Sequence, residues 1–235
     1  MRIAVWQARG PDDGARRLAR AAAEAAAADA DVLVTPELFS TGYGAPFGPA
    51  DPALDRRLKL IAAEHDIALV ASEPHGGRIT AVVVGPDGEL LGRYAKTHLW
   101  GPDERAAFVP GDGTPLLVDL AGLRCAVVIC FDVEFPEVVR GVALAGAEVV
   151  LVPTALDDPA VATVLLPARA MENGVTIAYA NQCGAPFCGS SLIAGPDGAV
   201  LARAGDGEEL LVADVDRPEG LTDYLAARRP ETYRW

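Results

Sequence analysis

The sequence predicts an α/β fold built from two similar halves. Apolar, strand-like runs alternate with helical patterns along the 235-residue chain, which is typical of layered α/β proteins. The tetrapeptide GPDG also occurs twice, at 85–88 and 195–198, each time inside an expected hairpin that follows a strand–helix–strand series. No linker or low-complexity stretch divides the chain, so we expect residues 1–235 to form one domain.

In the first half, Asp12 and Asp13 are candidate N-caps for an Ala-rich helix. Leu54, Leu58 and Ile61 recur with helical spacing. Asp87-Gly88 supplies the tight turn of a hairpin. The expected elements are strand 2–7, a helix to about residue 28, strand 30–37, helix 51–66, strand 67–73 and hairpin 79–96.

The second half repeats this order. Pro136 suits the first turn of a helix, and Gly174 suits a helix C-terminus. Pro167 predicts a kink or a late start in the helix before Gly174. The expected elements are strand 123–130, helix 136–147, strand 148–155, a helix ending near 173–174, strand 175–184, hairpin 191–203 and strand 209–216.

Charge and composition narrow the possible partners and location. The formal net charge is −13, and a polyanionic surface repels nucleic acid and acidic membranes, so we expect neither as a partner. The N-terminus lacks a signal-peptide pattern and the apolar runs are too short to cross a bilayer, which predicts a cytoplasmic location. The spacing of the cysteines and histidines does not favour a metal site.

Cys130 is the first candidate for chemistry. In VVICFDVEFPE (127–137) an apolar strand delivers this cysteine to a polar turn that precedes a helix. Such a turn exposes a nucleophile near free backbone N–H groups, which can stabilise an oxyanion. We expect Cys125, Cys183 and Cys188 to be small buried residues instead. Position alone leaves the nucleophile and the buried role equally open for Cys130.

A catalytic cysteine needs a group that carries its proton. His98 is one candidate, although a Cys–His pairing has little support in the spacing. Glu37 closes an apolar strand and could act as a general base with a raised pKa. Lys96 ends the expected hairpin and could stabilise a developing oxyanion. For both residues the alternative is an ordinary solvated position at a strand end.

Three ordered blocks, PELFSTGY, KTHLWGPDERAAFVPG and ICFDVEFPE, resemble the catalytic blocks of the nitrilase superfamily of carbon–nitrogen hydrolases. Within it the chain most resembles the aliphatic amidase branch that includes 5-aminopentanamidases. The resemblance implies a four-layer αββα sandwich of two similar halves. It also implies a catalytic set of Glu37, Lys96 and Cys130, with Glu104 as a second glutamate and no cofactor.

The implied reaction is hydrolysis of a small aliphatic amide to a carboxylate and ammonia through a thioester on Cys130. We expect Glu134 to attract the distant amine of an ω-amino amide, the alternative being a surface position or pairing with Arg140. The segments that resemble pocket walls contain Tyr43, Phe131, Thr154, Ala155 and Asn181. Segments 75–82 and 156–167 depart from the family pattern and affect loops that shape the pocket.

Two alternatives remain open. The enzyme could instead cleave N-carbamoyl compounds, as ureidopropionases do, or nitriles. In a different class, the same sandwich could serve as a catalytically silent interaction protein, although such a protein has no chemical need for the complete Glu–Lys–Cys set. The family resemblance also predicts a homo-oligomer, a dimer or higher; the aromatic and arginine content of YLAARRPETYRW fits an interface, the alternative being an ordinary docked terminus.

Overall fold

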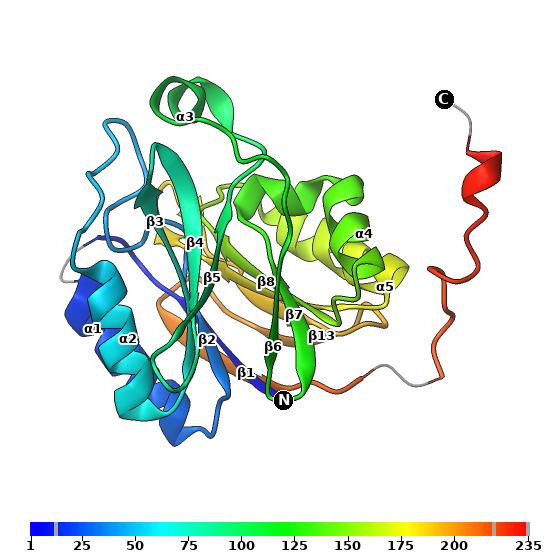
Figure 1. Ribbon diagram of the computed structural model, residues 1–235, viewed down its shortest axis with the longest axis horizontal. Coiled ribbons are helices and arrows are strands. Elements are labelled where there is room, and N and C mark those ends of the chain that lie inside the picture. Colours follow the sequence, from blue (N-terminus) through cyan, green and yellow to red (C-terminus); the bar gives the residue numbers. More distant parts are fainter. Residues whose placement is uncertain (12–13, 218–219, 234–235) are drawn as a thin grey trace.

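The computed structural model describes residues 1–11, 14–217 and 220–233, and two six-stranded mixed sheets form its centre (Figure 1). The first sheet contains, in spatial order, β14 (Glu209–Asp214), β1 (Arg2–Gln7), β2 (Val32–Val34), β3 (Ala68–His75), β4 (Arg78–Val84) and β5 (Leu90–Ala95). The second contains β13 (Val200–Arg203), β12 (Leu192–Ala194), β9 (Thr176–Asn181), β8 (Val149–Thr154), β7 (Leu123–Val127) and β6 (Leu116–Leu120).

Helices cover the outer faces of both sheets (Figure 1). The first sheet is covered by α1 (Gly14–Ala27) and α2 (Leu54–His65), and the second by α4 (Pro136–Leu144) and α5 (Leu166–Asn173). The remaining elements are α3 (Gly101–Ala107), the 3-10 turns η1 (Cys130–Glu134) and η3 (Pro230–Thr232), the π-helical turn η2 (Val161–Leu165) and the short hairpin β10 (Cys183–Gly184) with β11 (Phe187–Cys188). This arrangement confirms the predicted αββα sandwich.

Alternation along β2 shows how the sequence fills both interfaces. Val32 and Val34 belong to the core that includes the facing sheet, whereas Leu33 belongs to the core beneath α1 and α2. Successive side chains of a strand point to opposite faces, so an all-apolar strand packs on both sides. The central strands of both sheets are therefore buried on both faces, as their continuous apolar runs require.

The two sheets share one pairing pattern, which accounts for the repeated GPDG. In each, two parallel pairings are followed by two antiparallel ones, and the last antiparallel hairpin carries GPDG between β4 and β5 or between β12 and β13. Gly88 and Gly198 have φ of 80° and 81°, which favours glycine. A Cβ atom on either would approach a helix of the adjacent layer, at Lys59 O (2.8 Å) or Pro167 O (3.1 Å).

The last strand ties the halves together. β14 pairs antiparallel with β1, in a register that joins Arg2 to Asp214, so the end of the second half completes the first sheet. Beyond it, the C-terminal segment extends away from the sandwich (Figure 1). Among the described helices, none has the length and apolar character that crossing a membrane requires.

Several predicted boundaries were wrong. Strands 30–37 and 123–130 end early, at Val34 and Val127, because the chain turns out of the sheet where Leu38 (φ 49°) and Cys130 (φ 47°) take left-handed conformations. The predicted strand 175–184 runs past the end of β9 at Asn181 into β10, and α3, β6 and β11 were not predicted, because their short ranges give little periodicity. The proposed caps Asp12 and Asp13 lie outside the described residues.

The helix that contains Pro167 is irregular just before the proline. Its α-helical part starts at Leu166, with the proline in the first turn, and the preceding turn is π-helical. Proline is tolerated there because it has no N–H to donate to a preceding carbonyl. Gly174 ends the helix with a φ of 61°, as expected for a C-terminal glycine.

Candidate active site

The segments that follow β2, β5 and β7 bring Glu37, Lys96 and Cys130 together at one end of the two facing sheets. The backbone N–H of Glu37 donates to the Thr154 carbonyl at 3.1 Å, across from one sheet to the other. Gln182 Nε2 donates to the Glu37 carbonyl at 2.7 Å. Contacts from the second sheet therefore fix the position of a residue that belongs to the first.

Cys130 is the first residue of η1, and its φ of 47° is unusual for a residue other than glycine. The turn is closed by the Asp132 N–H, which donates to the Ile129 carbonyl at 3.0 Å. α4 follows almost at once, beginning at Pro136. A nucleophile on a sharp strand-to-helix turn is exposed above the sheet, and the Cys130 side chain lines a cavity.

The ammonium group of Lys96 lies between two carboxylates. Its Nζ donates to Glu37 Oε1 at 2.8 Å and to Glu104 Oε1 at 2.7 Å, and all three residues are buried. Glu104 also accepts hydrogen bonds from the Tyr43 hydroxyl and from the Trp100 N–H. The buried Glu37 Oε2 has no hydrogen-bond partner among the described residues. One oxygen of that carboxylate is therefore left for chemistry.

Burial and charge set the protonation of these groups. Burial raises the pKa of Glu37 to about 7, although the Lys96 ammonium acts in the opposite direction. Burial lowers the pKa of Lys96, but the charges of the neighbouring carboxylates Glu37 and Glu104 outweigh it, so the pKa is raised and the ammonium persists. Burial and Glu37 raise the pKa of the Cys130 thiol, against the effect of Lys96. The resting cysteine is therefore a thiol beside a carboxylate that titrates near neutral pH.

A cavity of about 190 Å³ opens in front of Cys130. This volume suits a small molecule rather than a drug-sized ligand. Its lining is rich in aromatic side chains, and Phe131 packs edge-on against Trp100 with ring centroids 4.9 Å apart. The lining residues are Tyr43, Gly44, Trp100, Cys130, Phe131, Ala155, Leu156, Asp157, Pro186 and Phe187.

The structure separates the predicted pocket residues into two groups. Tyr43, Phe131 and Ala155 line the cavity, whereas Glu134, Thr154 and Asn181 are not among its lining residues. Asn181 supports the wall instead, since its side-chain amide exchanges hydrogen bonds with the backbone of Leu156 at 2.8 and 3.0 Å. Glu134 is half-buried, and its pKa is raised by burial and by the nearby charge of Asp158.

Sequence reasoning missed several wall residues. Pro186 and Phe187 come from the β10–β11 hairpin, which is distant in sequence from the three motif blocks. Asp157 supplies the carboxylate of the lining, from a segment that the sequence reading marked as atypical. Trp100 stands inside the KTHLWGPDE block, so its sequence neighbours could have identified it.

Histidine does not take the place of Glu37 beside the thiol. The His98 Nδ1 atom lies 2.9 Å from Asp132 Oδ1, and its ring stacks on Phe135 with centroids 3.8 Å apart. Cys125 is buried in the core and its pKa is raised to about 12, chiefly by burial. This environment fits the expected structural role of Cys125. Among the described residues, no cluster of three or more His, Cys, Asp or Glu side chains could hold a metal ion.

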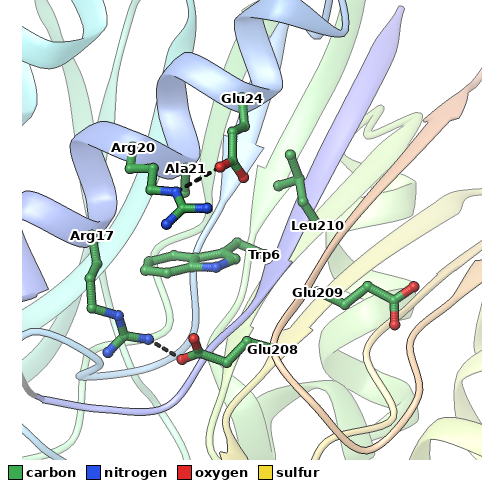
Figure 2. Close-up of a pocket in the computed structure, with 8 residues that line it drawn as sticks. All are labelled: Trp6, Arg17, Arg20, Ala21, Glu24, Glu208, Glu209 and Leu210. Carbon is green, nitrogen blue, oxygen red and sulfur yellow. Dashed lines mark hydrogen bonds and ion pairs between the residues drawn. The ribbon is translucent and has the colours of Figure 1, made fainter.

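A second cavity, of about 270 Å³, lies beside α1 and β14 (Figure 2). Figure 2 shows the Trp6 ring between two ion pairs, Arg20 with Glu24 and Arg17 with Glu208. Four of its five charged lining residues are thus paired with one another, and no cysteine lines it. The cavity in front of Cys130 is the better candidate for a reaction site.

Two sheets between helical layers, with a buried thiol beside a carboxylate–lysine pair at the sheet ends, define an αββα sandwich protein equipped for hydrolytic chemistry. The chain belongs to the carbon–nitrogen hydrolase family, whose model matches residues 2–220. It is a hydrolase that acts on carbon–nitrogen bonds other than peptide bonds. The nitrilase-superfamily expectation is thereby confirmed.

Individual relatives point to amide hydrolysis. A variant of the amidase from Nesterenkonia sp. AN1, solved with acrylamide added at its active-site cysteine, is 41% identical with a TM-score of 0.89, covering 98% of this chain and 97% of that one. Another variant was solved with butyramide. An (R)-stereoselective amidase from Pseudomonas sp. is 37% identical over 99% of this chain and 90% of its own. A nitrilase from Pyrococcus abyssi is 35% identical over 95% and 94%.

Proposed function

We propose that this protein is a cysteine amidohydrolase that cleaves a small aliphatic amide to a carboxylate and ammonia through a thioester on Cys130. The observation that carries the proposal is the buried contact of Lys96 with Glu37 and Glu104, next to a cysteine that lines a small cavity. This set supplies a nucleophile, a proton carrier and a fixed positive charge. No part of the reaction requires a cofactor.

In the first half-reaction, Cys130 Sγ attacks the amide carbonyl carbon as Glu37 accepts the thiol proton. The raised pKa of the thiol means that the proton moves with the attack rather than before it. Glu37 then gives the proton to the nitrogen, the carbon–nitrogen bond breaks, and ammonia leaves. A carboxyl group with a pKa of about 7 is suited to both directions of transfer, since proton transfer is most efficient when the pKa lies near the working pH.

In the second half-reaction, Glu37 takes a proton from a water molecule that attacks the thioester carbon. The carbon–sulfur bond breaks, the acid is released, and the sulfur recovers its proton. The balance is one amide and one water consumed, and one carboxylic acid and one ammonia formed. Proton shuttling of this kind is worth about 10²–10⁴ in rate.

The oxyanion that forms in each half-reaction needs donors. We assign this role to the Lys96 ammonium, which the neighbouring carboxylates Glu37 and Glu104 keep charged, and to the Phe131 N–H. The latter lies in the first turn of η1, where N–H groups lack acceptors within the helix. Losing one such donor typically costs about 10²–10³ in rate. Glu104 orients Lys96.

The cavity suggests the substrate class. Its aromatic walls and small volume fit a short aliphatic chain, and the butyramide complex of the related amidase supports such a substrate. Asp157 in the lining and the half-buried Glu134 nearby add negative charge. This charge favours an ω-amino amide, the substrate type of the 5-aminopentanamidase branch.

The oligomeric state and the cellular location are also proposals. We infer that the protein works as a homo-oligomer, supported by the exposed apolar side chains of Leu144, Val164 and Met171 on α4, η2 and α5. Light scattering on the purified chain would test this. A cytoplasmic location would fit a catalytic thiol, because that compartment keeps cysteines reduced.

The competing activities can be separated in one assay. The protein is incubated with butyramide, butyronitrile and N-carbamoyl-β-alanine, and ammonia is measured, while acid-quenched samples are examined by mass spectrometry for an acyl group on Cys130. We expect ammonia from the amide at the highest kcat/KM and an adduct of acyl mass. A higher kcat/KM for butyronitrile or for N-carbamoyl-β-alanine would favour a nitrile hydrolase or an N-carbamoyl amidohydrolase. No product from any of the three compounds would favour a catalytically silent interaction protein.

The matched control is Cys125→Ala. Cys125 is also buried and lies on β7, the strand that leads into the Cys130 turn, but no described contact joins it to Glu37 or Lys96. We expect Cys130→Ala to abolish ammonia release and the adduct, while Cys125→Ala retains both. If Cys130→Ala releases ammonia as fast as the wild type, the central proposal is wrong.

A further inference from the structure

Asp132 is a fully buried carboxylate that contacts the segment carrying Lys96. Its Oδ1 accepts hydrogen bonds from Thr97 Oγ1 at 2.6 Å and from the His98 N–H at 2.8 Å. Its Oδ2 accepts one from the Tyr94 hydroxyl at 2.8 Å. The Tyr94 side chain precedes Lys96 in the sequence, whereas Thr97 and His98 follow it. One carboxylate therefore holds a side chain before the lysine and the backbone directly after it.

The same carboxylate holds the turn that carries the nucleophile. Asp132 lies in η1 with Cys130, and its Oδ2 accepts a hydrogen bond from the Ile129 N–H at 3.3 Å. Ile129 directly precedes the cysteine, whose left-handed φ of 47° needs support from its surroundings. The segment of Lys96 and the turn of Cys130 are thus joined through a single group.

The donors require a group that only accepts. Oδ1 faces the N–H groups of Thr97 and His98, and Oδ2 faces the N–H of Ile129. Backbone N–H groups cannot reverse direction, unlike hydroxyls. An asparagine amide has one oxygen and one NH₂. In either orientation its NH₂ therefore faces a backbone N–H, that of Ile129 on one side or those of Thr97 and His98 on the other. An ionised carboxylate satisfies both sides, and such charge-assisted bonds are stronger than neutral ones.

We propose that Asp132 is a positioning residue that fixes the distance between Lys96 and the Cys130 turn during amide hydrolysis. The inference deepens the proposed function and rests on it. Asp132 acts through geometry, because no described contact joins its carboxylate to Glu37, to Lys96 Nζ or to Cys130 Sγ. A displacement of about 1 Å in a reaction site can cost about 10² in rate, so a connector of this kind influences turnover without touching substrate.

Other contacts allow the segment to keep its local fold without Asp132. The Lys96 N–H donates to the Ile79 carbonyl at 2.9 Å, and the Gly111 N–H donates to the Lys96 carbonyl at 2.8 Å. The lysine therefore remains attached to the first sheet when the carboxylate is changed. What changes is its relation to η1, which belongs to the second half of the chain.

The test is Asp132→Asn, which keeps the size of the side chain and removes the second acceptor. We expect kcat for butyramide to fall about 10- to 100-fold while KM changes less than about threefold. Alkylation of Cys130 by iodoacetamide should slow as well, because Lys96 no longer stabilises the thiolate. Leu18→Ala, in the core beneath α1, serves as a control with lowered Tm, and its kcat should stay within about twofold of the wild type.

A double-mutant cycle with Lys96→Met separates positioning from general damage. We expect Asp132→Asn to slow alkylation in the wild type but to add less than about twofold in the Lys96→Met protein. The inference is overturned if Asp132→Asn slows alkylation equally in the wild type and in the Lys96→Met protein. It is also overturned if Asp132→Asn leaves kcat unchanged, or if Leu18→Ala loses as much kcat at the same Tm. Alkylation needs no amide substrate, so the cycle tests the role of Asp132 even if the protein cleaves no amide. The absence of amide cleavage would contradict the proposed function and not the positioning role.

A second pair of variants applies if Asp132→Asn does not fold. Tyr94→Phe and Thr97→Ala each remove one donor to the carboxylate and keep its charge. Each should lower kcat about two- to tenfold, with little change in KM. Wild-type kcat in both variants would contradict the positioning role.

Discussion

Lys96 Nζ lies 2.7 Å from Glu104 Oε1, as close as its 2.8 Å contact with Glu37 Oε1. One ammonium group is thus shared by two buried carboxylates. Glu37 has an oxygen free for proton transfer, whereas both oxygens of Glu104 are engaged. The geometry therefore assigns the proton to Glu37 and the orientation of Lys96 to Glu104.

Glu104→Gln should lower kcat about 10- to 100-fold, since the lysine loses a charged partner that fixes its direction. The glutamine keeps the shape of the side chain, so the fold should persist. Steady-state kinetics with butyramide measures the loss. Tyr43→Phe, which removes a neighbouring hydrogen bond to the same oxygen, should cost less. Equal losses in the two variants would contradict a separate role for the charge of Glu104.

The acidic limb of the pH–rate profile should lie near pH 7 rather than near 4.5. Burial raises the pKa of Glu37 to about 7, and only the ionised carboxylate can accept the thiol proton. Activity is therefore present above this pKa and is lost as the pH falls through it. The measurement is kcat/KM for butyramide between pH 5 and 9, and Glu37→Gln should lose about 10²–10⁴ in rate at the optimum.

Glu73 supplies a matched control for this profile. It is another buried glutamate whose pKa is raised to about 7, mainly by burial, but no described contact joins it to the reaction site. Glu73→Gln should leave the acidic limb in place. If the acidic limb shifts in Glu73→Gln but stays in place in active Glu37 variants, the titrating group is Glu73 and the assignment to Glu37 is wrong.

Asp157→Asn should raise KM for 5-aminopentanamide and leave KM for pentanamide unchanged. Asp157 lines the cavity but is exposed, and an exposed ion pair is worth about 0.2–1 kcal/mol, or up to about fivefold in KM. Glu134→Gln tests the original expectation in the same assay. Because Glu134 is not among the lining residues, its effect should be the smaller. If Asp157→Asn changes KM equally for 5-aminopentanamide and pentanamide, Asp157 does not recognise the amine.

Gly88→Ala should destabilise the fold more than Gly113→Ala. Both glycines have left-handed φ angles, 80° and 84°, so both variants carry a similar strain of about 1–2 kcal/mol. A Cβ at residue 88 would also lie 2.8 Å from the Lys59 carbonyl oxygen, whereas one at residue 113 meets open space. Thermal unfolding of both variants measures the difference. Equal Tm values would show that the hairpin moves away from α2 without cost.

Much of this protein is determined locally by its sequence. Alternating apolar strands and amphipathic helices, the two GPDG turns and the position of Gly174 could all be predicted, because periodicity and turn chemistry depend on near neighbours. The three motif blocks identified Glu37, Lys96, Cys130 and Glu104, and the structure brings these side chains into one buried cluster.

Only the tertiary structure decided how distant segments meet. That β14 completes the first sheet, that Phe187 and Asp157 line the cavity while Glu134 does not, and that Asp132 joins the Lys96 segment to the Cys130 turn all depend on long-range packing. Sequence spacing carries no information on such contacts, because they form between elements whose local patterns are independent. The reacting groups could be read from the sequence, whereas their pocket and its supports emerge only when the two sheets face each other.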